Sequence, residues 1–302
     1  MYIPYFRGKQ FDLIGLRESV SKGLIGKDTI PLVEPVRDSK QLLKTLEAFI
    51  KYQQEILVVA NPEVGQVQKG MPKLHDWADC YDSPYVIPVY ITDNNLKAKE
   101  IQGNEYAFLS TRYIGGMLEE LLEAHSPKVH IISDSARLRR VVKDNQILLT
   151  DPFTKLNSGT DYLELEDEFY CDDHKFFRED GYIGFSNYGI DGKHYVDKGF
   201  PSRAVVLHIL YIDKFGSVRI KHFTSDSNDS YGDIQMKFRE ALGKLVRWQQ
   251  YFRKEVPLTV GLRELISYRA NEEYPGPGTI KKLLVMHQME LMKEPLYPIQ
   301  SW

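Results

Sequence analysis

The sequence predicts an α/β fold, a (β/α)₈ TIM-like barrel followed by a C-terminal β-hairpin and a helical appendage. Short apolar runs recur eight times before residue 190, and most of the first seven are almost continuously apolar. Strands buried on both faces, as in a parallel sheet, have this composition, whereas half-exposed antiparallel strands alternate polar and apolar residues. Amphipathic stretches separate the runs, as crossover helices between parallel strands would. Eight such units close naturally into a barrel.

The expected strands are the apolar runs 2–6, 29–36, 55–60, 85–92, 106–111, 128–133, 146–150 and 181–188. Between them, residues 39–53 place five apolar side chains on one stripe at helical spacing, namely Leu42, Leu43, Leu46, Phe49 and Ile50. Ser39 is suited to cap the start of that helix. Residues 10–21, 113–124 and 135–142 are further expected helices.

Two features favour a doubly wound open sheet as the alternative. Pro31, Pro35 and Pro88 fall within expected strands, where proline cannot donate a ladder hydrogen bond. The link of residues 152–180 is acidic and long for a crossover, which leaves room for a helix of its own.

The pattern changes after the eighth run. Residues 204–212 and 217–224 flank the turn Asp213-Lys214-Phe215-Gly216, which is typical of a hairpin. Helical patterns follow at 233–254, 259–272 and 279–293. We expect residues 1–200 to form the barrel core and residues 201–302 to pack on it, without forming an independent domain.

The amino-acid composition argues against nucleic-acid binding over the whole surface and against a membrane location. The chain has 302 residues and a formal net charge of −3, so it lacks the basic excess typical of nucleic-acid binding over the whole surface. No apolar run reaches the roughly 18 residues of a membrane span, and none at the start suits a signal peptide. A cytoplasmic location without membrane binding is therefore expected. Cys171 and His174 lack the second ligand pair of a structural zinc site, so no metal site is predicted.

The carboxyl ends of barrel strands are where reacting and ligand-binding groups gather. This rule selects as ligand-binding candidates five residues that follow expected strands: Arg7, Lys9, Arg37, Asn61 and Arg137. The alternative for each of them is that loops after strands are ordinarily polar and exposed. Polar residues in such loops also cap the next helix, as Asp and Ser do. Glu34 is a candidate proton-transfer residue because it lies in an apolar run, where a carboxylate needs a partner. Arg37 or Arg7 could supply that partner, and a purely structural ion pair is the alternative.

His222 and Asp226 are the other catalytic candidates. They lie close together at the end of the run 217–224, where a histidine with a carboxylate partner could act as a general base. The strand period places His222 and Thr224 on one face. No Gly-x-Ser-x-Gly elbow accompanies them, so a structural role is the alternative.

Three short motifs resemble the bacterial and phage "beta protein" family of uncharacterised proteins. They are the opening 2–11, Pro31-Leu32-Val33-Glu34-Pro35, and the segment 184–190. The resemblance implies a barrel-like fold and a setting near phage-defence or mobile-element genes. It implies no reaction and no catalytic residues.

A weaker resemblance is to glycerophosphodiester phosphodiesterase barrels, through Phe6-Arg7-Gly8 and Glu34. Those begin with His-Arg-Gly and continue with a Glu-x-Asp metal pair. Here Phe6 replaces the histidine, and Glu34-Pro35-Val36 lacks the second carboxylate.

Two hypotheses of function remain. The first is a hydrolase acting on a phosphorylated or nucleotide-like substrate, in which the arginines and Lys9 hold the anion and Glu34 or His222 moves a proton. The second is a non-catalytic immunity or regulatory partner that binds another protein, since barrels host both kinds of function. The cofactor, if there is one, is not readable from the residues.

Overall fold

The computed structural model describes residues 1–37, 39–66, 79–93, 96, 100–101, 105–190, 192–197, 202–252, 256–271 and 273–293. The chain forms two compact units. The barrel unit comprises residues 1–23, 27–151 and 173–189, and the second unit comprises residues 24–26, 152–172 and 190–302. The link 152–172 therefore belongs to the second unit. The expected packing of residues 201–302 on the barrel stays a prediction.

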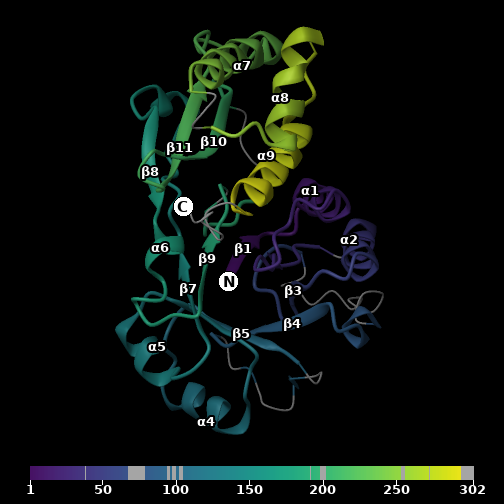
Figure 1. Ribbon diagram of the computed structural model, residues 1–302, viewed down its shortest axis with the longest axis vertical. Coiled ribbons are helices and arrows are strands. Elements are labelled where there is room, and N and C mark those ends of the chain that lie inside the picture. The colour runs from purple at the N-terminus through teal and green to yellow at the C-terminus, as the bar shows by residue number, and fades with distance from the viewer. Residues whose placement is uncertain are drawn as a thin grey trace, which may run out of the picture. The chain divides into compact units, whose positions relative to one another are not determined.

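The barrel unit is a closed ring of eight parallel strands (Figure 1). They are β1 (Tyr2–Phe6), β2 (Leu32–Val33), β3 (Ile56–Val59), β4 (Val86–Ile91), β5 (Ala107–Ser110), β6 (His130–Ser133), β7 (Gln146–Thr150) and β9 (Gly184–Tyr188). Each strand falls within its predicted run. β1 pairs with β2 on one side and β9 on the other, which closes the ring. The predicted barrel is thus confirmed, and the open sheet is excluded.

Helices connect the strands where the amphipathic patterns predict them. They are α1 (Gln10–Ser21), α2 (Lys40–Lys51), α4 (Gly116–Ala124) and α5 (Ala136–Val141). The short α6 (Asp173–Phe176) lies in the link before the last strand, where the sequence left room for a helix without a specific pattern. In α2, Leu42, Leu46 and Phe49 of the predicted stripe are buried, whereas Leu43 and Ile50 are half-buried. The Ser39 hydroxyl accepts a hydrogen bond of 3.2 Å from the amide of Leu42. Across the described residues of both units, no helix is long and apolar enough to cross a bilayer.

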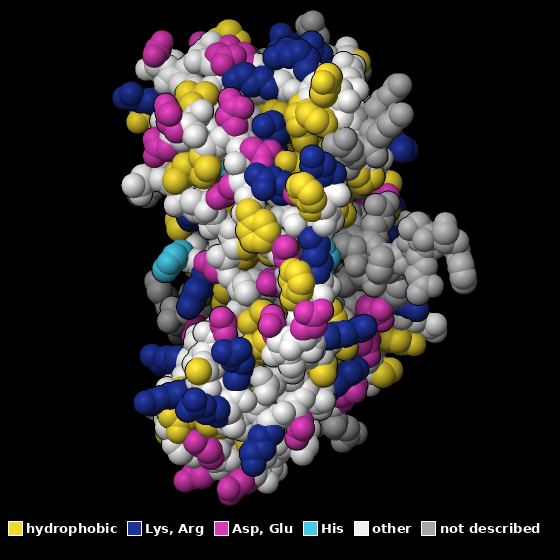
Figure 2. Space-filling view, turned by 60° about the vertical axis from the view of Figure 1, so that its left-hand side comes forward, with side chains coloured by type: hydrophobic (Ala, Val, Ile, Leu, Met, Phe, Trp, Pro, Cys, Tyr) yellow, Lys and Arg dark blue, Asp and Glu magenta, His cyan; other side chains and the backbone are white. Residues whose placement is uncertain are grey.

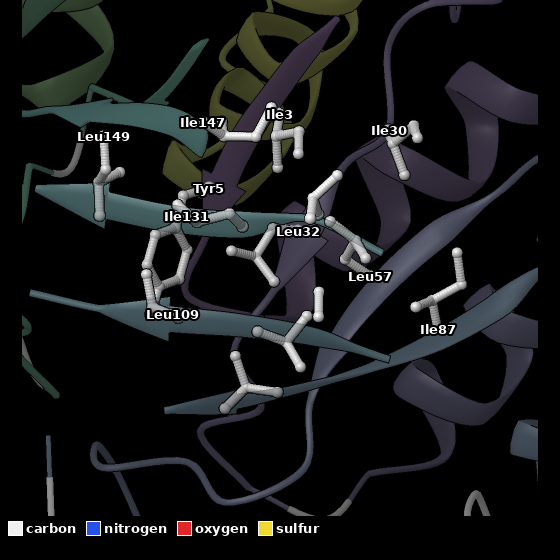
Figure 3. Packing of buried hydrophobic residues seen from close by; sticks show 14 of the residues in the cluster. Ile3, Tyr5, Ile30, Leu32, Leu57, Ile87, Leu109, Ile131, Ile147 and Leu149 are labelled. Atoms are coloured by element: carbon white, nitrogen blue, oxygen red, sulfur yellow. The ribbon is translucent and has the colours of Figure 1, made fainter. Parts of the chain in front are cut away.

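Branched aliphatic side chains fill the barrel interior. Ile3, Leu32 and Leu57 point inward from the first three strands, and Leu109, Ile131 and Ile147 do so from strands further along the chain (Figure 3). Successive strand residues alternate between the interior and the outer surface. Both faces are covered, because residues such as Phe108 and Ile132 are buried on the outer side as well. This double burial explains the continuous apolar runs.

The prolines in the strands do not disrupt the ladder. Strand β2 has only two residues, and Pro31 and Pro35 flank it. Pro88 lies within β4, but the register of β4 with β5 begins one residue later, at Val89 opposite Ala107. The amide of Thr92 donates to Leu109 of β5, so alternate amides of β4 face β5. Pro88 therefore precedes the first bond of that ladder, and its missing N–H costs little.

The second unit is built on an antiparallel sheet of β8 (Asp167–Cys171), β10 (Val206–Ile212) and β11 (Val218–Thr224) in the order β10-β11-β8. The predicted hairpin is β10–β11, and Gly216 adopts a φ of 75° in its turn. The predicted helices are α7 (Ile234–Tyr251), α8 (Val260–Asn271) and α9 (Pro277–Leu291) (Figure 1). Their apolar side chains share one core with those of the sheet. The link supplies β8 and a 3-10 helix at Gly159–Leu163.

Gly184 lies where the barrel closes, and we expect its replacement by a larger residue to destabilise the protein. An added Cβ would lie 2.5 Å from the Met1 carbonyl oxygen and 2.8 Å from Ile147 Cδ1. We expect Gly184→Ala to lower the free energy of unfolding by about 1–3 kcal/mol, as overpacking does. The matched control is Gly116→Ala, where nothing lies within 4 Å, and it should change stability by less than about 0.5 kcal/mol. Equal effects of the two substitutions in chemical denaturation would contradict this account of the closure.

His287 should make the second unit sensitive to acid. Its Nε2 donates to the Leu210 carbonyl at 2.7 Å, and its Nδ1 lies 2.8 Å from Thr259 Oγ1. Burial lowers the pKa of His287 to about 4. The unfolded chain binds this proton near pH 6.5, so stability is complete above that pH and falls as the pH drops towards 4.

The loss should be on the order of 3 kcal/mol. His287→Gln can keep both hydrogen bonds without titrating, so its unfolding free energy should depend less steeply on pH between 6.5 and 4. Denaturation curves followed by tryptophan fluorescence across this range measure the difference. Parallel pH profiles of the two proteins would rule out the role given to His287.

Candidate functional site

An ion pair lies at the carboxyl ends of the first two barrel strands. Arg7 follows β1 and is 8% exposed, and Glu34 follows β2 and is 1% exposed. Arg7 Nη1 donates to Glu34 Oε2. Of the two partners that the sequence offers for Glu34, the structure therefore pairs it with Arg7. The Tyr5 hydroxyl also donates to Oε2 at 2.7 Å, and the Glu63 amide donates to Oε1 at 2.8 Å. Both carboxylate oxygens thus accept hydrogen bonds, from three donors that belong to two segments of the chain.

Two tyrosine rings surround the Arg7 guanidinium. Tyr5 and Tyr188 stack with ring centroids 4.7 Å apart, and the guanidinium carbon lies 5.0 Å and 5.2 Å from the two centroids. Such contacts stabilise a cation that is removed from water. Burial raises the pKa of Tyr5 well above its usual value, and the negative charge of Glu34 adds to this. Burial likewise raises the pKa of Tyr188. Both phenols therefore stay protonated, and Tyr5 remains a hydrogen-bond donor.

Gly8 allows the chain after β1 to pass close to the end of β2. Its φ is 55°, a conformation that side chains disfavour. A Cβ there would lie 2.8 Å from the Glu34 carbonyl oxygen and 3.0 Å from Val33 Cγ1. The glycine of Phe6-Arg7-Gly8 thus has a steric role beside the ion pair.

Polar side chains after β3 and β4 also connect neighbouring strand ends by hydrogen bonds. The Asn61 side chain, which follows β3, donates to the Ile91 carbonyl and accepts from the Ile91 amide, both at 2.8 Å. Asp93, which follows β4, accepts from the Thr111 amide at 2.9 Å. Each of these polar groups connects one strand end to its neighbour. We call Arg7, Glu34, Asn61 and Asp93 with these partners the rim network.

The other three ligand-binding candidates lie in the helices and loops that follow the strands. Lys9 directly precedes α1, and its amide donates to Asp12 Oδ2 at 3.2 Å. Arg37 is exposed after β2. Arg137 is exposed on α5, with its guanidinium carbon 5.8 Å from the centroid of the Tyr113 ring. The structure therefore pairs Arg7 with Glu34 and joins Asn61 to the end of β4, whereas Arg37 and Arg137 are exposed.

His222 and Asp226 lie in the second unit, so neither belongs to the barrel rim. His222 Nδ1 lies 2.7 Å from His208 Nδ1, and its Nε2 lies 3.2 Å from Glu168 Oε1. Burial lowers the pKa of His222, although the hydrogen bond and charge of Glu168 act in the opposite direction. Asp226 pairs instead with Lys244, at 2.7 Å. The carboxylate beside His222 is thus Glu168 of β8, and both ring nitrogens are engaged.

A cavity of about 270 Å³ lies beside His222. We call it the basic cavity, and it is lined by Tyr162, Leu163, Glu166, Lys221, His222, Phe223, Thr224, Lys244, Arg247 and Trp248. Three cationic side chains and one carboxylate line it, so the lining is net positive. The sequence pattern predicted a role for His222 but not for these cations. The spacing along the predicted helix does indicate them, because Arg247 and Trp248 follow Lys244 by three and four residues and therefore lie on the same helix face.

The face of the molecule in Figure 2 mixes basic and acidic side chains without segregation of one charge. A duplex-binding surface would instead gather cations to neutralise phosphates.

Comparison of the chain with family models, with curated proteins and with solved structures finds no match in any of the three. The resemblance to the "beta protein" family and the weaker one to glycerophosphodiester phosphodiesterases stay predictions.

The Arg7–Glu34 pair should be a large contributor to barrel stability. Removing one partner of a buried pair leaves an uncompensated charge and costs about 3–5 kcal/mol. We expect Glu34→Gln to destabilise the protein by this amount in chemical denaturation. The control is Glu18→Gln, which removes a solvent-exposed pair with Lys22 and should cost at most about 1 kcal/mol. A Glu34→Gln protein as stable as the control would show that the pair is not structural.

Proposed function

We propose that this protein binds a phosphorylated or nucleotide-like small molecule in the basic cavity of the second unit, without turning it over. The observation that carries the proposal is the convergence of Lys221, Lys244 and Arg247 on one cavity. Phosphate groups are recognised in proteins by such clusters of charged donors.

Two of the cations are held in place by neighbours that keep them in the lining. Lys244 Nζ donates to the Thr224 carbonyl and to Asp226 Oδ1, both at 2.7 Å. Lys221 Nζ lies 3.8 Å from Asp167 Oδ2. Positioned charges lose less side-chain freedom when a ligand arrives, which favours binding.

A buried hydroxyl adds a directional group. Thr224 is 2% exposed, and its Oγ1 has no hydrogen-bond partner among the described residues. An unsatisfied hydroxyl in a buried position is costly, and a phosphate oxygen would satisfy it. His222 lies on the same face of the strand. Because burial lowers its pKa, its ring is neutral and adds no charge to the cavity wall.

Aromatic rings supply the surface for the organic part of the ligand. Tyr162 and Trp248 line the cavity with Leu163 and Phe223. Aromatic faces stack on bases and other planar groups. A volume of about 270 Å³ is near the lower end for small-molecule sites, which suits a compact phosphate ester.

A hydrolase centred on Glu34 or His222 is less well supported. A general base must reach the proton that it abstracts, and it needs a free lone pair to accept that proton. Glu34 is 1% exposed and its carboxylate already accepts hydrogen bonds from three donors, so a substrate does not reach it. Both nitrogens of His222 lie within hydrogen-bond distance of other groups. Binding without catalysis requires neither group to act. A protein partner, and the phage-defence setting implied by the family resemblance, remain predictions.

Arg247→Gln should weaken binding of a nucleoside monophosphate or sugar phosphate at least tenfold, measured by calorimetric titration at low salt. A charged hydrogen bond contributes about 1.5–3 kcal/mol, and 1.4 kcal/mol is a factor of ten. Affinity should also fall as salt is raised, since the cation is exposed.

The matched control is Arg239→Gln, which alters an exposed arginine of the same helix outside the cavity lining. It should bind as the unaltered protein does. The proposal fails if no phosphorylated compound of the panel binds at millimolar concentration, or if the control loses as much affinity as Arg247→Gln.

A further inference from the structure

A second cavity, of about 560 Å³, lies in the barrel unit between the ends of α4 and α5. Its lining includes residues 122–123 and 125–127 around the end of α4, residues 140–145 around the end of α5, and His130 at the start of β6. It is therefore at the amino-terminal end of its strand, away from the strand ends that carry the rim network. Neither the rim nor the basic cavity shares a residue with it.

His130 is a buried wall of this cavity with one unsatisfied nitrogen. Its exposure is 0%, and it faces the outer side of the barrel. Its Nε2 lies 2.7 Å from Ser110 Oγ, which in turn lies 2.6 Å from Thr92 Oγ1. Its Nδ1 has no hydrogen-bond partner within the described part of the chain. Burial lowers the pKa of His130 to about 3, so the ring is neutral and has one donor and one acceptor.

The α4 wall of the cavity is rich in acceptors. Glu119 Oε1 accepts a hydrogen bond of 2.8 Å from the Tyr113 hydroxyl, whereas Glu119 Oε2 is buried with no partner in the described residues. Glu123 lines the cavity one turn later, on the same face of α4. Helix α4 ends at Ala124, and its terminal carbonyl groups carry partial negative charge. This wall therefore favours a ligand that is cationic and has several N–H donors.

The wall formed by the end of α5 and the residues after it carries two cations and the carboxylate of Asp144, and so has a net positive formal charge. Arg140 and Lys143 line it, from the last turn of α5 and the residues that follow. Leu122, Pro127 and Val141 provide apolar surface between the two walls. A ligand that carries an ammonium group and a carboxylate would be matched at both ends, with room for a side chain.

We propose that this cavity binds a small zwitterion of the amino-acid type, whose ammonium group donates to Glu119 Oε2 and His130 Nδ1 and whose carboxylate faces Arg140 and Lys143. The ammonium supplies the hydrogen bonds that the two buried atoms lack. Binding then requires the neutral His130 tautomer that carries its proton on Nε2, with Nδ1 as the acceptor.

The test is a calorimetric titration of the full chain with free L-amino acids, followed by the amine and the acid that correspond to the best of them. We expect an amino acid to bind, and the decarboxylated amine and the deaminated acid each to bind at least tenfold more weakly. Glu119→Gln should lower the affinity for the amino acid at least tenfold. Its matched control is Glu120→Gln, which alters an exposed residue of the same helix outside the lining.

Nuclear magnetic resonance gives a readout that a merely structural role of Glu119 would not move. The Nδ1 resonance of His130 should shift on addition of the amino acid, and the protonated nitrogen should be Nε2. The proposal is overturned if no amino acid binds at millimolar concentration, if Glu120→Gln weakens binding as much as Glu119→Gln, or if the His130 ring does not respond to a ligand that binds.

Discussion

The structure of the barrel unit depends on one constraint, which is that β1 pairs with both β2 and β9. This double pairing converts a row of parallel strands into a ring without free edges. It also forces the polar residues after the strands to a common rim above a packed apolar interior. Side chains in that position are partly removed from water, so each needs a hydrogen-bond partner.

The rim network is the consequence of this constraint. Glu34 binds Arg7 and the Glu63 amide, Asn61 binds both backbone groups of Ile91, and Asp93 binds Thr111. Polar groups that could have faced a ligand are engaged in joining one strand end to the next. This is why the candidate binding sites are found elsewhere: the basic cavity in the second unit, and the His130 cavity on the outer side of the barrel.

The sequence predicted the barrel well because burial on both faces leaves continuous apolar runs, such as 56–59 in β3, that are legible locally. Because Glu34 lies in one of these apolar runs, the sequence also predicted that its carboxylate requires a partner. It could not predict that β8 pairs with β11, because those strands are about fifty residues apart and no local pattern specifies such a contact. That pairing places Glu168, and not Asp226, beside His222. The identity of this carboxylate could therefore not be predicted from the sequence either. His130 was missed because it stands inside an apolar run and is typical of an ordinary strand residue.

Amide hydrogen exchange of β1 and β9 tests the closure of the barrel most directly. The Phe185 amide donates to the Met1 carbonyl at 3.0 Å, and the register continues to Tyr5 opposite Tyr188. If the ring is closed, the amides bonded between these two strands exchange only through opening of the whole barrel, as slowly as those of β4 and β6. Exchange of the β1 and β9 amides at loop-like rates, with the other strands protected, would show an open sheet and contradict the account.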